Sequence, residues 1–216
     1  MPLALFDLDN TLLTGDSDHA WGVFLAERGI VDAGEHVRAH DRFLAQYHAG
    51  VLDIHEFLEF QLRSLAQFAR ADLERWRGEY LEVKVRPMMT ESARELVNGH
   101  RRRGDRPIVI TATNSFITRP IANEFGVDTL IATEPEQLGG RFTGRVAGVP
   151  CFREGKVTRL EAWLDENGES LDGSWFYSDS HNDLALLERV AHPVAVNPDE
   201  RLAAHAETKG WRVIRF

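Results

Sequence analysis

Cysteine is nearly absent from this sequence: Cys151 is the single example in 216 residues, so no intramolecular disulfide can form. No apolar stretch approaches the ~20 residues that a membrane span requires, so none is predicted. The first apolar run lacks a basic flank and breaks at Asp7, which argues against a signal peptide. A lone thiol without a targeting segment indicates a reducing compartment, and we expect a cytoplasmic protein.

Positive charge is scarce as well. Lys and Arg number 25 against 34 Asp and Glu, a net charge of −9, which disfavours nucleic acid or an acidic membrane as a partner. The one basic run, residues 100–103, precedes Gly104, where cations complement the C-terminus of a helix. The length fits one large domain or a core with an insert, and the composition leaves the oligomeric state open.

Two kinds of hydrophobic pattern divide the chain. Residues 16–81 carry only helical periodicity, starting at an N-cap candidate, Asp16, and no strand signal appears among them. After Pro87, buried strands alternate with helices, which is typical of a parallel sheet covered on both sides. We therefore predict an α/β fold with a doubly wound, mostly parallel, Rossmann-like sheet formed by residues 1–15 and 82–216. A helical insert, residues 16–81, is expected over the C-terminal edge of that sheet.

The individual elements follow from the same periodicity. After a first helix that ends at Gly29, helices are predicted at 34–49, 53–69, 71–84, 90–103, 117–125, 155–166, 181–190 and 199–208. After the N-terminal apolar run, strands are predicted at 107–111, 128–132, 142–149, 174–178, 194–196 and 212–214.

The N-terminal strand ends in Asp7, Asp9 and Thr11, which alternate along the chain and therefore start out on one face. Two carboxylates this close repel each other unless a cation lies between them. A site for a hard divalent cation is one interpretation, and a polar turn at the end of a strand is the other.

Ligands of such sheets bind beyond the carboxyl ends of the strands, where polar residues gather again. Thr111 follows one buried strand, and Asp179 to Asp183 follow another. Each cluster also has a local explanation, since Thr111 to Ser115 can cap a helix and Asp183 fits a capping box. Lys156 stands at the start of a predicted helix, where a positive charge is unfavourable to the helix dipole and costs about 0.3–1 kcal/mol. Either an anion lies nearby for the lysine to bind, or the lysine is a solvated surface residue.

In these four ordered motifs the sequence resembles the haloacid dehalogenase superfamily of phosphatases. The helical insert after the first motif is similar to the cap of the phosphoserine-phosphatase branch. Three short stretches, Gly155–Val157, Asn197–Asp199 and Lys209–Trp211, resemble a subgroup that includes bacterial histidinol-phosphatases.

The resemblance implies a Mg²⁺-dependent phosphomonoesterase in which Asp7 attacks phosphorus to give an aspartyl-phosphate. Asp9 would protonate the leaving alcohol and later take a proton from water. Mg²⁺ would be held by the Asp7 carboxylate, the Asp9 main-chain carbonyl and Asp179. The remaining positions implied are Lys156, Thr11, Thr111, Ala112 and Asn182 around the phosphate or substrate, and Asp183 orienting Lys156 or a metal-bound water.

The expected partner is a small soluble phosphomonoester. Asp16 stands where phosphoserine phosphatases carry an acid for the substrate ammonium, although it can equally cap the first helix. Those relatives also use an arginine for the substrate carboxylate, and here the stretch Glu59–Leu62 lies near that position, with Arg63 the nearest arginine. This departure favours an amino-alcohol phosphate such as histidinol phosphate over phosphoserine. A phosphotransferase using the same aspartyl-phosphate and a non-catalytic phosphate-binding protein are the further alternatives.

Other reactive residue types have plainer interpretations. His36 and His40 share a helix face but lack a third ligand, so they are predicted to be surface residues rather than metal ligands. Cys151 has no activating neighbour in the sequence, which disfavours a nucleophilic thiol.

Overall fold

A computed structural model describes residues 1–216 and contains one seven-stranded sheet in the order β4-β3-β2-β1-β5-β6-β7. Its strands are β1 (Leu3–Phe6), β2 (Arg106–Asn114), β3 (Thr129–Leu138), β4 (Arg141–Ala147), β5 (Trp175–Ser178), β6 (His192–Val196) and β7 (Arg212–Ile214). All neighbouring pairs are parallel except the β3–β4 hairpin, which is antiparallel. The short β1 lies at the centre, between β2 and β5.

Both faces of the central strand are buried, which explains its unbroken apolar sequence. Ala4 and Phe6 belong to a hydrophobic cluster on one face, and Leu3 and Leu5 belong to a second cluster on the other. Helices α5 (Glu91–Arg102) and α6 (Ser115–Glu124) contribute to the first cluster. The second is covered by α7 (Glu154–Asn167), α8 (Leu184–Leu187) and α9 (Glu200–Lys209). Helices on both faces confirm the predicted doubly wound α/β fold.

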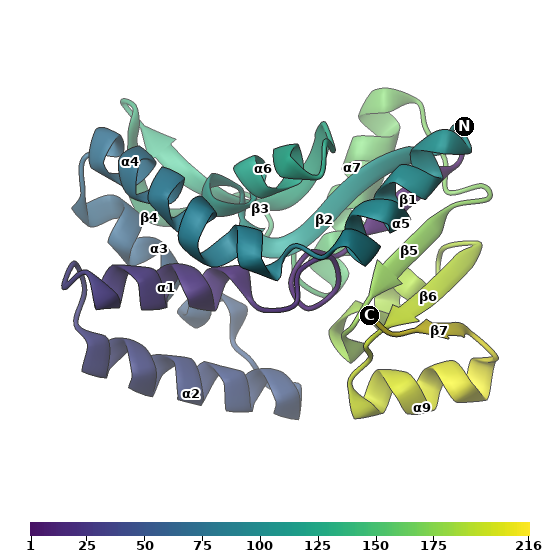
Figure 1. The fold of residues 1–216 in the computed structure, drawn as a ribbon, viewed down its shortest axis with the longest axis horizontal. Helices are drawn as coiled ribbons and strands as arrows, with labels where there is room; N and C mark the ends of the chain where they lie inside the picture. Colours follow the sequence, from purple (N-terminus) through teal and green to yellow (C-terminus); the bar gives the residue numbers. More distant parts are fainter.

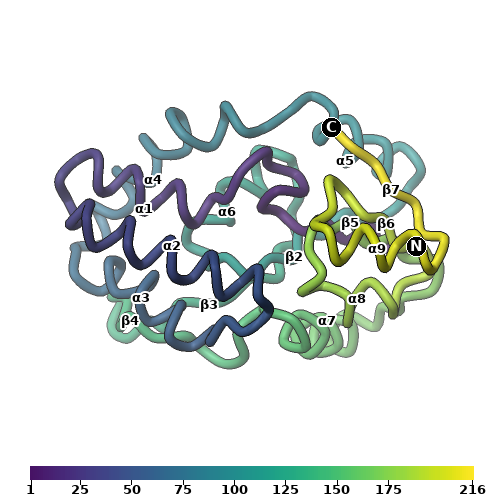
Figure 2. The backbone as a smooth tube through the Cα atoms, turned by 90° about the horizontal axis from the view of Figure 1, so that it is seen from below, coloured from purple at the N-terminus to yellow at the C-terminus, as the bar shows by residue number.

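All the regular elements between β1 and α5 are helices, apart from an isolated β-bridge between Leu13 and Met89. The α-helices of this segment are α1 (Ser17–Glu27), α2 (Ala33–Ala49), α3 (Ile54–Gln67) and α4 (Arg70–Tyr80). Figure 1 shows them gathered at one end of the molecule beside the β3–β4 hairpin, with α9 at the other end, and Figure 2 shows α1, α2 and α3 side by side. Phe24 of α1 and Leu62 of α3 join the same hydrophobic cluster as Phe6, so these helices are packed firmly onto the sheet.

Three elements differ from the sequence prediction. The helix predicted at 71–84 ends at Tyr80 and continues as a π-helical turn, Leu81–Val85. The strand predicted at 128–132 continues to Leu138 because β4 pairs along its second half. The helix predicted at 181–190 is a 3₁₀ turn, His181–Asp183, followed by the single turn of α8. None of the helices combines the length and apolar character that crossing a bilayer demands.

Candidate active site

The first motif is presented by the end of β1. Asp7 follows this strand directly, and its N–H donates to the Tyr177 carbonyl at 2.9 Å, which continues the ladder to β5 by one residue. The chain then turns at Asn10, which has a positive φ of 56°, a conformation that Asn tolerates better than most residues. This turn leaves Asp7 at the edge of the sheet, where the residue is 7% exposed and lines a pocket.

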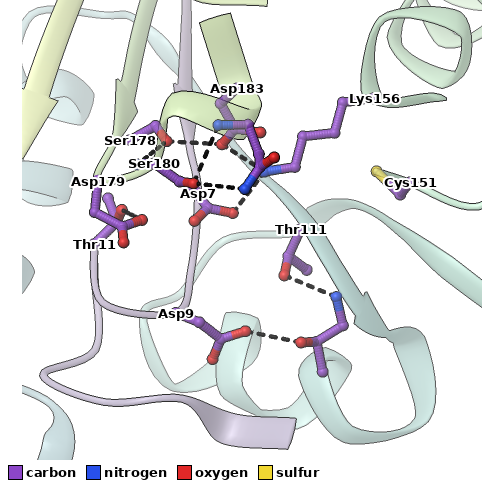
Figure 3. Close-up of polar contacts among 12 residues, drawn as sticks. Asp7, Asp9, Thr11, Thr111, Cys151, Lys156, Ser178, Asp179, Ser180 and Asp183 are labelled. Atoms are coloured by element: carbon purple, nitrogen blue, oxygen red, sulfur yellow. Dashed lines mark hydrogen bonds and ion pairs between the residues drawn. The ribbon is translucent and has the colours of Figure 1, made fainter. Parts of the chain in front are cut away.

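Lys156 lies between two of the predicted acids. Its Nζ donates to Asp7 Oδ1 at 2.8 Å and to Asp183 Oδ2 at 2.7 Å, and all three side chains are buried. Helix α7 can begin here because Gly155 precedes Lys156: a Cβ at Gly155 would lie 2.0 Å from the Pro150 carbonyl oxygen. The lysine at the start of the helix therefore has two anions to bind. Figure 3 shows the three side chains converging from separate elements.

The electrostatics of this triad are set by burial. Burial raises the pKa of Asp7 to about 7, and Asp183 adds to the rise, whereas the Lys156 ammonium opposes it. Burial alone would lower the pKa of Lys156, but Asp183 and Asp7 outweigh it and hold its pKa well above the ordinary value. The lysine thus remains charged and favours the carboxylate form of Asp7.

Asp179 follows β5, the strand beside β1, so its side chain faces the same edge as Asp7. Burial, followed by repulsion from Asp7 and Asp183, raises the pKa of Asp179 well above its usual range, and Thr11 Oγ1 donates to Asp179 Oδ1 at 3.2 Å. No three His, Cys, Asp or Glu side chains converge as a metal group. The predicted Mg²⁺ site needs only two carboxylates and the Asp9 main-chain carbonyl, all hard oxygen donors, and a cation there would offset the repulsion. The donor set therefore fits Mg²⁺.

Asp9 is held from two sides. Its Oδ1 accepts from the Ser17 N–H at 2.6 Å, and its Oδ2 accepts from Thr113 Oγ1 at 2.8 Å. Burial raises the pKa of Asp9 to about 6, with a further contribution from Asp16. Ser17 begins α1 and Thr113 is the penultimate residue of β2, so the helical insert and the sheet jointly orient this carboxylate. Thr113 belongs to the polar cluster that the sequence places after this strand, but a role in holding Asp9 was predicted neither for it nor for Ser17.

The phosphate-side residues lie in the same pocket. Thr111, Ala112 and Asn182 all line it, and Thr111 Oγ1 accepts from the Thr113 N–H at 3.2 Å. Asn182 Oδ1 accepts from Arg153 Nε at 2.8 Å, and its Nδ2 donates to Ser180 Oγ at 3.3 Å. Thr11 is not among the lining residues: it is buried beside Asp179, so the geometry favours a role in holding that acid over direct contact with phosphate.

The helical insert contacts the catalytic edge at two further points. Tyr47 Oη of α2 donates to Ser180 Oγ at 2.7 Å, and Arg153 Nη2 donates to the Gly50 carbonyl at 2.7 Å. The first contact joins the end of α2 to the fourth motif, and the second joins it to the start of α7. These side chains were not predicted either, because contacts between an insert and a core leave no trace in local periodicity.

The pocket between sheet and insert has a volume of about 180 Å³ and two unlike walls. The sheet side is acidic. The side from the insert is largely apolar and includes Phe43, Leu44, Tyr47, Ile54 and Phe57. A more open cleft of about 740 Å³ lies beside β6 and β7 and is lined by Lys209 to Trp211, but it contains no residue of the four ordered motifs. The side chains of those motifs gather at the smaller pocket.

Asp16 fulfils the capping role that was one of its two interpretations. Its Oδ1 accepts from the His19 N–H at 2.9 Å, and the side chain also lines the pocket. Arg63 lies outside the pocket, where it pairs with Glu35 at 2.8 Å. No arginine lines the pocket at all.

The prediction that His36 lies on the surface is wrong. It is 6% exposed and packs against α1 at Gly22, where a Cβ would meet the ring at 1.9 Å. The missing side chain of Gly22 creates this space, which helix periodicity does not reveal. Cys151 is buried, and burial raises its pKa to about 12, which agrees with the prediction that it is not a nucleophile.

Comparison with known proteins gives consistent matches. A model of the haloacid dehalogenase-like hydrolase family matches residues 4–188. The chain is 44% identical over 218 residues to the histidinol-phosphatase of Neisseria meningitidis serogroup C (strain 8013), covering 99% of this chain and 98% of that protein. A crystal structure of a protein of unknown function from Bordetella pertussis Tohama I has a TM-score of 0.93 at 46% identity, with coverage of 99% and 97%.

A more distant structure has the same fold. A phosphoserine phosphatase studied as a phospho-aspartyl intermediate analogue is 19% identical to this chain with a TM-score of 0.71, and the match covers 98% of this chain and 91% of that one. At this identity the likeness concerns the arrangement of the elements.

Proposed function

The chain belongs to the haloacid dehalogenase-like hydrolase family and is a phosphatase, and we propose that it hydrolyses histidinol phosphate through an aspartyl-phosphate on Asp7. The observation that best supports the mechanism is the buried triad of Lys156, Asp7 and Asp183 at the edge of the sheet where β1 ends. Lys156 binds Asp7 Oδ1 only, which leaves the second oxygen of the nucleophile for phosphorus.

The reaction would proceed in two displacements. Asp7 forms a bond to phosphorus while the bond from phosphorus to the ester oxygen breaks, and Asp9 gives its proton to the departing alcohol. Water then attacks phosphorus, the bond between phosphorus and the Asp7 oxygen breaks, Asp9 takes up a proton of that water, and inorganic phosphate leaves with Asp7 restored as a carboxylate. A pKa of about 6 suits Asp9 to both transfers near neutral pH. Lys156 and Thr111 would bind the phosphoryl oxygens, on which negative charge accumulates.

Asp7, Asp179 and the Asp9 carbonyl would hold Mg²⁺, which when bound lowers the repulsion between the anionic nucleophile and the anionic ester. Thr11 would keep Asp179 in place through its 3.2 Å hydrogen bond. Asp183 would orient Lys156 and is itself bound by Ser178 Oγ at 2.7 Å. We propose that residues 16–81 form a cap that restricts the site to small esters. We also propose that the protein acts in the cytoplasm.

The choice of histidinol phosphate rests on two observations. One is the 44% identity to a histidinol-phosphatase along nearly the whole of both chains. The other is the charge of the pocket, in which Lys156 is the only Lys or Arg among the lining residues, and both of its neighbours are acids. A phosphoserine carboxylate would find no free cation there, whereas an ester with an ammonium group and no carboxylate would be matched.

The test is a comparison of kcat/KM for L-histidinol phosphate and L-phosphoserine, with Mg²⁺ and with EDTA. We expect a clear preference for histidinol phosphate, and loss of turnover in EDTA that added Mg²⁺ restores. A preference for phosphoserine would reject the substrate. Full turnover in EDTA would reject the metal, and transfer of the phosphoryl group to an added alcohol in place of water would identify a phosphotransferase.

A further inference from the structure

A buried acid in the helical insert has no role in the reaction described above. Asp18 lies in the first turn of α1, is 4% exposed and lines the pocket. Its Oδ1 is buried without any hydrogen-bond partner. A buried carboxylate oxygen left unpaired is destabilising, and a cationic donor supplied by a ligand in the pocket would relieve that cost.

The surroundings of Asp18 make its charge more costly. Burial raises the pKa of Asp18 well above its usual range, and the nearby Asp16 and Asp9 add to the rise. The Gln61 side chain is the one neighbour that favours the charged form. Capping α1 does not account for the residue, because Asp16 already binds the free N–H of His19 at the helix start.

Neither lysine nor arginine in the pocket wall is free to pair with Asp18, and burial lowers the pKa of His40, another lining residue, which favours its neutral form. Lys156 is committed to Asp7 and Asp183, and no arginine lines the cavity. The insert also lines the pocket with Asp16, His40 and His48 and with apolar side chains, of which Phe43 is buried and Phe57 partly buried. A ligand that carries an ammonium group on a flat ring fits a site in which an acid and aromatic side chains line the same pocket. The ligand ring would pack against the aromatic side chains, and the ammonium would pair with the acid.

We propose that Asp18 is the specificity-determining residue of this pocket and binds the ammonium group of an amino-alcohol phosphate, with the ester's ring against the aromatic wall of the insert. This inference rests on the proposed phosphatase reaction at Asp7. It assigns Asp16 to capping α1 and gives recognition of the cation to the buried Asp18.

Asp18→Asn tests the assignment because it removes the charge and keeps the size of the side chain. The kcat/KM of L-histidinol phosphate is measured against that of glycerol 2-phosphate, which has no ammonium group. A hydrogen bond to a charged group contributes enough that its loss should lower this ratio by about 10- to 100-fold, mostly through KM. Asp72→Asn, which removes an exposed first-turn acid of α4 remote from the pocket, should leave the ratio unchanged.

The possible results separate the two proposals. If the wild-type protein does not prefer histidinol phosphate, the proposed substrate fails. If the wild type does prefer it but Asp18→Asn slows both esters equally, the inference about Asp18 fails by itself. Urea unfolding adds a second readout, because replacing a buried, unpaired carboxylate should raise the midpoint. A lower midpoint, or failure to fold, would make Asp18 a structural residue and overturn its assignment.

Discussion

Replacing Lys156 by methionine is the sharpest test of how the site is balanced. Methionine approximates the volume of lysine but carries no charge, so the change leaves Asp7 and Asp183 buried without their common cation. Truncating one partner of a buried ion pair costs about 3–5 kcal/mol, because the remaining charge has neither water nor a partner. We expect Lys156→Met to lower the free energy of unfolding by about that amount when Mg²⁺ is absent.

The same substitution should also reduce catalysis. Without the ammonium, the pKa of Asp7 would rise further above about 7, and less of the nucleophile would be ionised at neutral pH. Loss of a donor to the phosphoryl oxygens costs a further factor of about 10²–10³ in turnover. Adding Asp183→Asn to Lys156→Met should restore part of the stability, because it removes one of the two unpaired buried charges. It should restore none of the activity, because the Lys156 ammonium is still missing.

Urea denaturation in EDTA measures the stability, with Lys209→Met as the matched control, since Lys209 is exposed and should change stability by no more than about 0.5 kcal/mol. The reasoning would be refuted if the free energy of unfolding of Lys156→Met lay within about 1 kcal/mol of the wild-type value. That loss would be far smaller than the cost of leaving Asp7 and Asp183 buried without their cation.

Three further predictions concern separate groups. Asp9→Asn should lower kcat by about 10²–10⁴-fold in stopped-flow assays, and wild-type turnover would contradict its acid–base role. Burial lowers the pKa of His100 below the ordinary 6.5. As the pH decreases through about 6.5, the unfolded chain therefore binds a proton at this position before the folded protein does, and the stability should fall. Urea midpoints measured across this range should depend less steeply on pH in His100→Gln than in the wild type. Cys151 should resist iodoacetamide at pH 8 until urea is added, and rapid labelling of the folded protein would disprove its burial.

Sequence patterns captured the parts of this fold that depend on local rules. The alternation of strands and helices after Pro87 led to the doubly wound sheet, and polar residues at the ends of β1, β2 and β5 do share one pocket. Such inferences succeed because parallel strands place their carboxyl ends at one edge. Lys156 followed from a similar argument, since a cation at a helix start needs a nearby anion.

Features that depend on packing between distant segments were missed. Tyr47 of the insert binds Ser180, 133 positions away in sequence, only because the insert lies against the sheet. His36 is buried because of the space at Gly22, and Asp18, in the first turn of α1, is 4% exposed. None of these depends on periodicity, so the sequence alone carries no signal for them.

The central claim is that Asp7 becomes phosphorylated, and mass spectrometry of the enzyme quenched in acid during turnover tests it most directly. With histidinol phosphate and Mg²⁺, the peptide that contains Asp7 should carry one additional phosphoryl group, and Asp7→Asn should abolish this adduct. Rapid turnover with an unmodified Asp7 peptide, or with the phosphoryl group on another residue, would contradict the account.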